Sequence, residues 1–160
     1  MPDQREIMRK FVLPLACIPA SAWVPGLVLF NPGKPLDPVR LVHSAAVVYF
    51  GAVGSVLLLA ASLFLLAPLF MRRRNWARSL QVAAFSSAPT LLSGIVLLIP
   101  DLAFATLPAI FYTFYHLYVG AQRALGVKEG DSTEYVALVI VLFIIGSTLA
   151  GAFGSSLGLL

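Results

Sequence analysis

Charged residues are scarce in this chain of 160 residues, because Asp, Glu, Lys and Arg together make up only 11% of it. A soluble domain of this size carries about 25% charged residues on a surface that faces water. Here 59% of the residues are hydrophobic, so most of the surface faces lipid instead. The composition therefore predicts an integral membrane protein, with residues 1–160 forming a single membrane domain and no room for a soluble one.

Residues that form active sites and metal sites are also few. Cys17 is the only cysteine, which excludes a disulfide within the chain. His43 stands at the start of one predicted helix, at the membrane surface, and His116 lies about 21 Å of helical rise below the outer start of another, so they are not expected to share a metal or a haem. No nucleophile with a base and no carboxylate pair stands at a workable spacing. We therefore predict no catalytic residue, no metal, no cofactor and no enzymatic activity.

Most of the sequence consists of long apolar runs. Five of them reach the roughly 20 residues that a membrane span needs, at residues 11–30, 45–70, 79–99, 102–121 and 135–157. The first imitates a secretory signal with a cleavage site at Ala20-Ser21-Ala22, but apolar sequence continues through Phe30, which favours a retained helix. The prediction is an all-α, polytopic membrane helical bundle with five transmembrane helices.

Basic residues lie unequally at the two ends of these segments. One side holds Arg5, Arg9, Lys10, Arg72, Arg73, Arg74, Arg78, Arg123 and Lys128, whereas the other side holds only Lys34 and Arg40. Positive residues concentrate on the cytoplasmic side, so we expect a cytoplasmic N-terminus and a C-terminus outside. This bias also explains the net charge of +4 without a nucleic acid partner. The cluster Arg72, Arg73, Arg74 and Arg78 is a candidate for binding lipid headgroups, although a topology signal is the simpler interpretation.

Small and polar residues recur at four-residue intervals in two segments. Segment 79–99 carries a narrow polar stripe formed by Ser86, Thr90 and Gly94. Segment 135–157 carries a small-residue stripe formed by Gly146, Ala150, Gly154 and Gly158. Small residues so spaced let two helix backbones approach closely, which is the main packing device in lipid. We interpret the small-residue stripe as helix packing within the chain, in preference to contact with a second copy.

Segment 102–121 combines apolar residues with unusual hydrogen-bonding capacity, in the run Phe-Tyr-Thr-Phe-Tyr-His-Leu-Tyr-Val-Gly from Phe111 to Gly120. Tyr112, Tyr115 and His116 share one helical sector, since residues three and four apart are neighbours. With Tyr118 they are candidates for contact with a partner. The alternatives are hydrogen bonds within the bundle, such as one from a neutral His116 ring to Tyr112 or to the polar stripe, and tyrosines placed at the membrane interface.

From Gln81 to about Ala150 several motifs follow a known pattern. A proline-bearing segment ends in Leu98-Ile99-Pro100, the aromatic run places tyrosines at 112, 115 and 118 before Gly120, and Gly126-Val127 and Tyr135 continue the series. This region resembles the Yip domain family, the Ypt/Rab-interacting proteins with five membrane helices, and in particular its prokaryotic branch. Two positions depart from the pattern, because His116 replaces an aliphatic residue and Lys128 replaces a proline. Only ten residues precede the first segment, so Rab binding is not expected to carry over.

The scarcity of catalytic groups, the short loops and the small-residue helix faces favour a non-enzymatic membrane protein. The resemblance implies a scaffold or accessory subunit that binds other membrane proteins, within a larger complex, in addition to membrane lipids. The alternative is a small transporter or channel with a polar path between the third and fourth segments. We expect a multi-pass protein in the inner or plasma membrane of a prokaryote.

Overall fold

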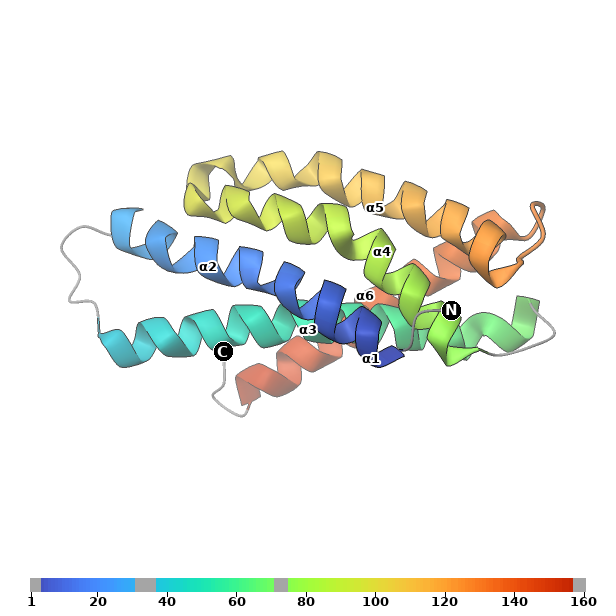
Figure 1. Ribbon diagram of the computed structural model, residues 1–160, viewed down its shortest axis with the longest axis horizontal. Helices are drawn as coiled ribbons and strands as arrows, with labels where there is room; N and C mark the ends of the chain where they lie inside the picture. Colours follow the sequence, from blue (N-terminus) through green and yellow to red (C-terminus); the bar gives the residue numbers. More distant parts are fainter. Residues whose placement is uncertain (1–3, 31–36, 71–74, 157–160) are drawn as a thin grey trace.

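The computed structural model describes residues 4–30, 37–70 and 75–156, which form five helical stretches and contain no strand (Figure 1). The first stretch comprises α1 (Gln4–Ile7), a π-helical turn η1 (Met8–Val12) and α2 (Leu13–Phe30), and the second is α3 (Pro38–Phe70). The third joins α4 (Trp76–Ser93) to the 3-10 helix η2 (Gly94–Leu98). The fourth joins the 3-10 helix η3 (Pro100–Thr106), α5 (Leu107–Gly120) and a π-helical turn η4 (Ala121–Leu125), and the last is α6 (Ser132–Ser156). The predicted all-α fold is confirmed.

Four of these stretches are long and apolar enough to cross a membrane, and they cover residues 4–30, 38–70, 76–98 and 132–156. The fourth stretch, residues 100–125, is helical throughout, but its three parts are each shorter than the 18 residues of such a span. The bundle is therefore a helical membrane bundle, while the count of five spanning helices and the orientation of the termini stay predictions.

Successive helices α2 to α5 run in alternating directions along the long axis, and α6 crosses behind α3 at an oblique angle (Figure 1). The end of α3, the start of α4 and the end of α5 with η4 lie toward one end of the bundle. The sequence places the basic residues Arg78, Arg123 and Lys128 at or near these element ends, so we call this the basic end.

Helix α3 begins at Pro38 and not at Ala45, where the apolar run led us to place its start. The reason is a helix cap that lies before the apolar run. The Asp37 carboxylate oxygen Oδ1 accepts a hydrogen bond from the Val39 backbone N–H at 3.0 Å. A proline in the first helical position suits this cap, because it has no N–H to satisfy there. His43, which we expected at the start of the helix, therefore lies inside α3, on an exposed face.

Helices α4 and α5 also differ from the predicted bounds. Asn75 caps α4 by accepting the Arg78 backbone N–H at 3.2 Å, so the helix begins at Trp76, before the apolar run does. Segment 102–121 was expected to be one helix, but α5 begins only at Leu107, with a 3-10 helix before it.

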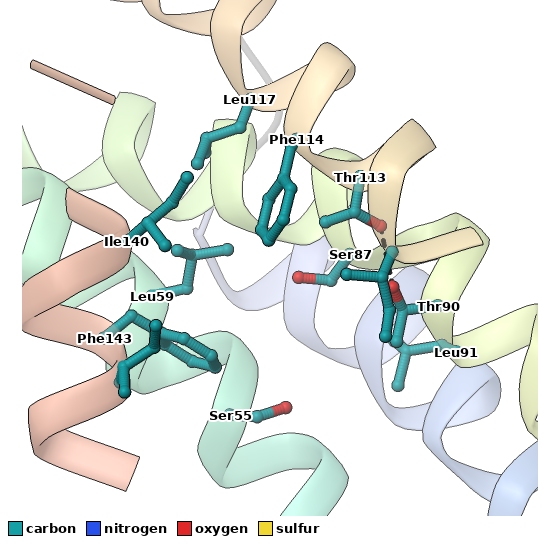
Figure 2. A pocket seen from close by; sticks show the side chains of 12 residues that line it. Ser55, Leu59, Ser87, Thr90, Leu91, Thr113, Phe114, Leu117, Ile140 and Phe143 are labelled. Atoms are coloured by element: carbon teal, nitrogen blue, oxygen red, sulfur yellow. Dashed lines mark hydrogen bonds between the residues drawn. The ribbon is translucent and has the colours of Figure 1, made fainter. Parts of the chain in front are cut away.

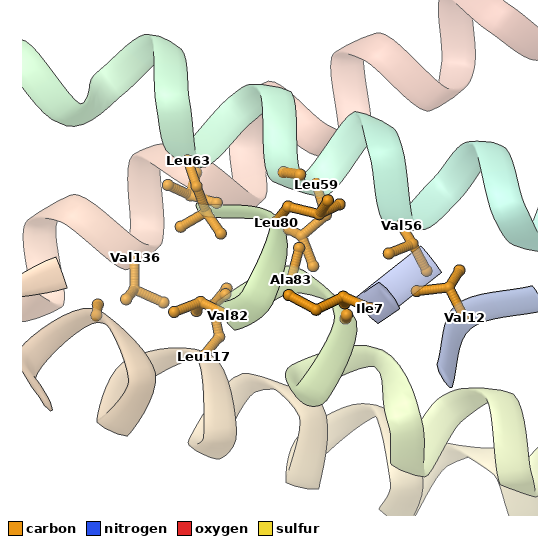
Figure 3. Close-up of a cluster of buried hydrophobic side chains, with 14 of the residues drawn as sticks. Ile7, Val12, Val56, Leu59, Leu63, Leu80, Val82, Ala83, Leu117 and Val136 are labelled. Carbon is orange, nitrogen blue, oxygen red and sulfur yellow. The ribbon is translucent and has the colours of Figure 1, made fainter. Parts of the chain in front are cut away.

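Buried hydrophobic side chains from several helices form one core (Figure 3), and most of those in α3 to α6 belong to the parts of these helices that lie toward the basic end. Helix α3 contributes Val56, Leu59 and Leu63, α4 contributes Leu80 and Ala83, α5 contributes Leu117, and α6 contributes Val136. The buried residues of α3 run from Val56 to Ala67, and those of α6 run from Ser132 to Val139. Packing is therefore uneven along both helices, and their other halves lie at the surface.

Tyr135 joins α6 to α3. Its side chain is fully buried, and its hydroxyl donates a hydrogen bond to the Leu63 backbone carbonyl at 2.7 Å. Its ring meets the Phe70 ring edge to face, with centroids 5.3 Å apart. A buried tyrosine needs such a partner for its hydroxyl, and the bond fixes the position of α6 on the bundle.

Candidate functional site

Tyr112, Tyr115 and His116 gather on the outer face of α5, and we call them the α5 aromatic patch. The ring centroids of Tyr112 and His116 are 4.3 Å apart, and those of Tyr115 and His116 are 5.9 Å apart, both edge to face. The two tyrosine rings stack at 6.2 Å. Tyr112 is 55% exposed and Tyr115 is 60% exposed. The structure thus brings these three residues together on the sector that their spacing predicts.

The His116 ring is held by its own helix. Its Nδ1 lies 3.1 Å from the Tyr112 backbone carbonyl oxygen, which can only accept, so Nδ1 carries the proton in this contact. We expected a hydrogen bond to Tyr112, and the partner is the backbone of that residue. Nε2 remains as the ring nitrogen available to a ligand or partner. Within the described part of the chain, neither Tyr112 nor Tyr115 uses its hydroxyl in a hydrogen bond.

Tyr118, the fourth candidate for partner contact, does not belong to this patch. It is half-buried and packs against the hydrophobic core. The structure therefore separates Tyr118 from the two exposed tyrosines, Tyr112 and Tyr115.

The polar stripe runs from α4 into η2, and its members lie in different surroundings: Thr90 is exposed, whereas Ser86 and Gly94 are buried. Ser86 is buried, and Gly94 lies so close to α2 that a Cβ added there would be 2.6 Å from the Pro19 Cβ. Thr90 meets Thr113 of α5, with 2.7 Å between the two hydroxyl oxygens. Thr113 was not singled out from the sequence, because a hydroxyl pair between two helices depends on their relative rotation.

A cavity of about 270 Å³ lies beside this hydroxyl pair, between α3, α4, α5 and α6 (Figure 2). Its walls are mostly apolar, and Figure 2 shows the Ser87 hydroxyl pointing in among them. A second cavity of about 350 Å³ adjoins it and shares Ser55, Thr90, Leu91 and Ile110. Neither Tyr112 nor Tyr115 lines these cavities, so the predicted polar path contains the hydroxyls of α4 without the tyrosines of α5.

The small-residue stripe of α6 makes close contact at one position. A Cβ on Gly146 would lie 2.9 Å from Cδ1 of Leu58 in α3, so this glycine packs within the chain. Ala150 is exposed and Gly154 is half-buried. Gly158, the last member of the stripe, lies outside the described residues.

Of the candidate headgroup contacts, Arg78 is exposed in the first turn of α4. Arg72, Arg73 and Arg74 lie outside the described residues. The described ranges hold no group of three His, Cys, Asp or Glu side chains that could bind a metal ion.

Comparison with known proteins identifies the family to which this chain belongs. No curated protein and no solved structure matches the chain. A family model, that of the Yip1 domain, matches residues 5–150. The match covers most of the chain and extends the resemblance from Gln81 back to Arg5, through α1, α2 and α3. The chain is therefore a member of the Yip1 domain family of membrane proteins.

Proposed function

We propose that this protein is a non-enzymatic scaffold or accessory subunit that binds other membrane proteins, and that the α5 aromatic patch contacts the partner within the membrane. The family supports a membrane protein that interacts with other proteins. The patch supports the place of contact, since it presents large aromatic surface and unpaired hydrogen-bonding groups on an outer helix face.

The observation that carries this proposal is the position of Tyr112. It stands at the middle of the helical stretch from Pro100 to Leu125, about 20 Å of helical rise from Leu125. Tyrosines in membrane proteins normally lie at the two interfaces, where the hydroxyl reaches water or headgroups. A tyrosine at mid-stretch reaches neither, and an unpaired polar group in hydrocarbon costs several kcal/mol. A partner that accepts from the hydroxyl removes this cost.

The proposed setting is the inner or plasma membrane of a prokaryote, with the basic end of the bundle in the cytoplasm. The described residues support this orientation, since Arg78, Arg123 and Lys128 lie at that end and Arg40 lies at the other. In this setting the patch lies in the hydrocarbon region, on the side of the bundle formed by α5.

Site-specific photo-crosslinking in intact membranes tests the proposal. A benzophenone amino acid at Tyr115 should give one protein adduct of defined mass, which should disappear when Tyr112→Leu and His116→Leu are added. The control places the same amino acid at Phe50, an exposed residue of α3. The proposal is wrong if Phe50 and Tyr115 give the same products, or if the adduct persists in the double variant.

The adjoining cavities favour one second candidate, a small transporter whose path follows the hydroxyls of Ser55, Ser87 and Thr90. Stabilisation of the isolated protein by a solute, lost in Thr90→Val, would favour this function. The exposed position of the tyrosines gives the scaffold the stronger support.

A further inference from the structure

A groove of about 220 Å³ runs between α4 and the α5–η4 stretch, near the basic end of the bundle. Its floor is the close contact of the two helices, where a Cβ on Gly120 would lie 2.8 Å from Cγ1 of Val82. Gln81, His116 and Arg123 line the groove together with the apolar side chains of Phe85 and Val119. The groove thus combines three nitrogen-bearing side chains with two large apolar walls.

The three nitrogen-bearing side chains of the groove retain unused hydrogen-bonding atoms. Arg123 is exposed and forms no ion pair with another described residue, and the Gln81 side chain makes no hydrogen bond within the same part of the chain. The contact of His116 with the Tyr112 carbonyl leaves Nε2 unused. A guanidinium and an amide supply several N–H donors and one full positive charge, which suits a phosphate group.

The groove extends from the basic end toward the middle of the bundle, and so crosses different depths of the membrane. Arg123 lies in the last turn of the helical stretch 100–125, and His116 lies seven residues earlier, about 10 Å deeper. The headgroup region is only about 5–8 Å thick on each side of the hydrocarbon core. The groove therefore begins at headgroup level beside Arg123 and reaches hydrocarbon level along Phe85 and Val119.

We propose that this groove binds a membrane phospholipid of net negative charge. Arg123 and Gln81 donate hydrogen bonds to the phosphate, and the first part of one acyl chain lies against Phe85 and Val119. Arg123 supplies the complementary charge within the groove, because a guanidinium donates charge-assisted hydrogen bonds to a phosphate. The apolar walls distinguish a lipid from free phosphate, since inorganic phosphate would leave them uncovered.

Native mass spectrometry of the purified full chain tests the proposal, with phosphatidylglycerol and phosphatidylcholine of identical chains as probes. The wild type should bind phosphatidylglycerol preferentially, and Arg123→Gln should weaken that binding about tenfold, as expected for a lost charge-assisted hydrogen bond. Gln81→Leu should weaken it less, and Val119→Trp, which fills the apolar part, should reduce binding of both lipids. Phosphatidylcholine has the same phosphate group, so Arg123→Gln should weaken its binding as well, but less, because its choline group already neutralises the charge. An unchanged melting temperature in detergent shows that the variant is folded.

Lys128→Gln is the matched control, because Lys128 is exposed in the next connection and does not line the groove. It removes the same charge and should leave the preference unchanged. Equal losses in Lys128→Gln and Arg123→Gln would show general attraction to the surface and overturn the proposal. Displacement of phosphatidylglycerol by millimolar inorganic phosphate would overturn it as well, in favour of a site for free phosphate.

Discussion

The contact between Gly94 and Pro19 gives a sharp test of how α2 and η2 pack. A Cβ added at Gly94 would lie 2.6 Å from Cβ and 2.9 Å from Cα of Pro19. Two carbon atoms prefer a separation of about 3.5–4.0 Å, so α2 has to move outward by about 1 Å to accept an alanine. The proline ring and backbone cannot rotate away as a flexible side chain could.

Backbone strain makes no contribution to this cost. Gly94 has φ −55° and ψ −19°, which any residue adopts, so Gly94→Ala tests only the space between the helices. Gly54 in α3 is the matched control, because its Cβ would meet nothing within 4 Å. Alanine gains up to about 1 kcal/mol over glycine within a helix, and both variants share some of this gain. The difference between them therefore reports the steric cost, for which overpacking gives about 1–3 kcal/mol.

The assay is thermal unfolding of the two purified variants in the same mild detergent, followed by loss of tertiary signal. Gly54→Ala should melt at or slightly above the wild-type temperature, and Gly94→Ala should melt several degrees below Gly54→Ala. The packing described for α2 and η2 is refuted if Gly94→Ala melts as high as Gly54→Ala.

Two further predictions concern the joint between α3 and α6 and the orientation of the bundle. Tyr135→Phe removes the donor to the Leu63 carbonyl and should lower the free energy of unfolding by about 0.5–1.5 kcal/mol. Tyr118→Phe should cost less in the same chemical unfolding assay, and equal costs would contradict the role of the bond. Labelling of single cysteines, in a chain without Cys17, should find the connection before Trp76 inside and the C-terminus outside; labels on one side only would contradict the proposed topology.

Much of the fold could be predicted from the sequence, because lipid demands that each apolar run satisfy its backbone as a helix. The errors lie at the ends of runs. Asp37 and Pro38 start α3 before its apolar residues do, since a cap depends on local hydrogen bonds and not on hydropathy. Likewise, no apolar pattern marks the change from 3-10 to α-helix at Leu107, so segment 102–121 looked uniform.

The candidate site could be predicted only in part. Spacing along one helix correctly brought Tyr112, Tyr115 and His116 together, because that geometry is local. Spacing could not show that the two tyrosines are exposed while His116 is half-buried beside α4, since in a membrane both the packed and the lipid-facing sides of a helix are apolar. The groove between Gln81 and Arg123 depends on how α4 and α5 are rotated against each other, which a single sequence does not encode in any simple pattern.

The hydrogen bond from Tyr135 to Leu63 joins residues 72 positions apart, and this separation has a consequence for biogenesis. A ribosome adds about 5–20 residues per second, so about 4–14 s pass between the synthesis of the acceptor and that of the donor. During this interval α4 and α5 are made and inserted, while the face of α3 that α6 covers in the finished bundle stays open. Assembly of the bundle is completed only when the last helix docks, and the newborn protein depends until then on lipid or on the insertion machinery to cover α3.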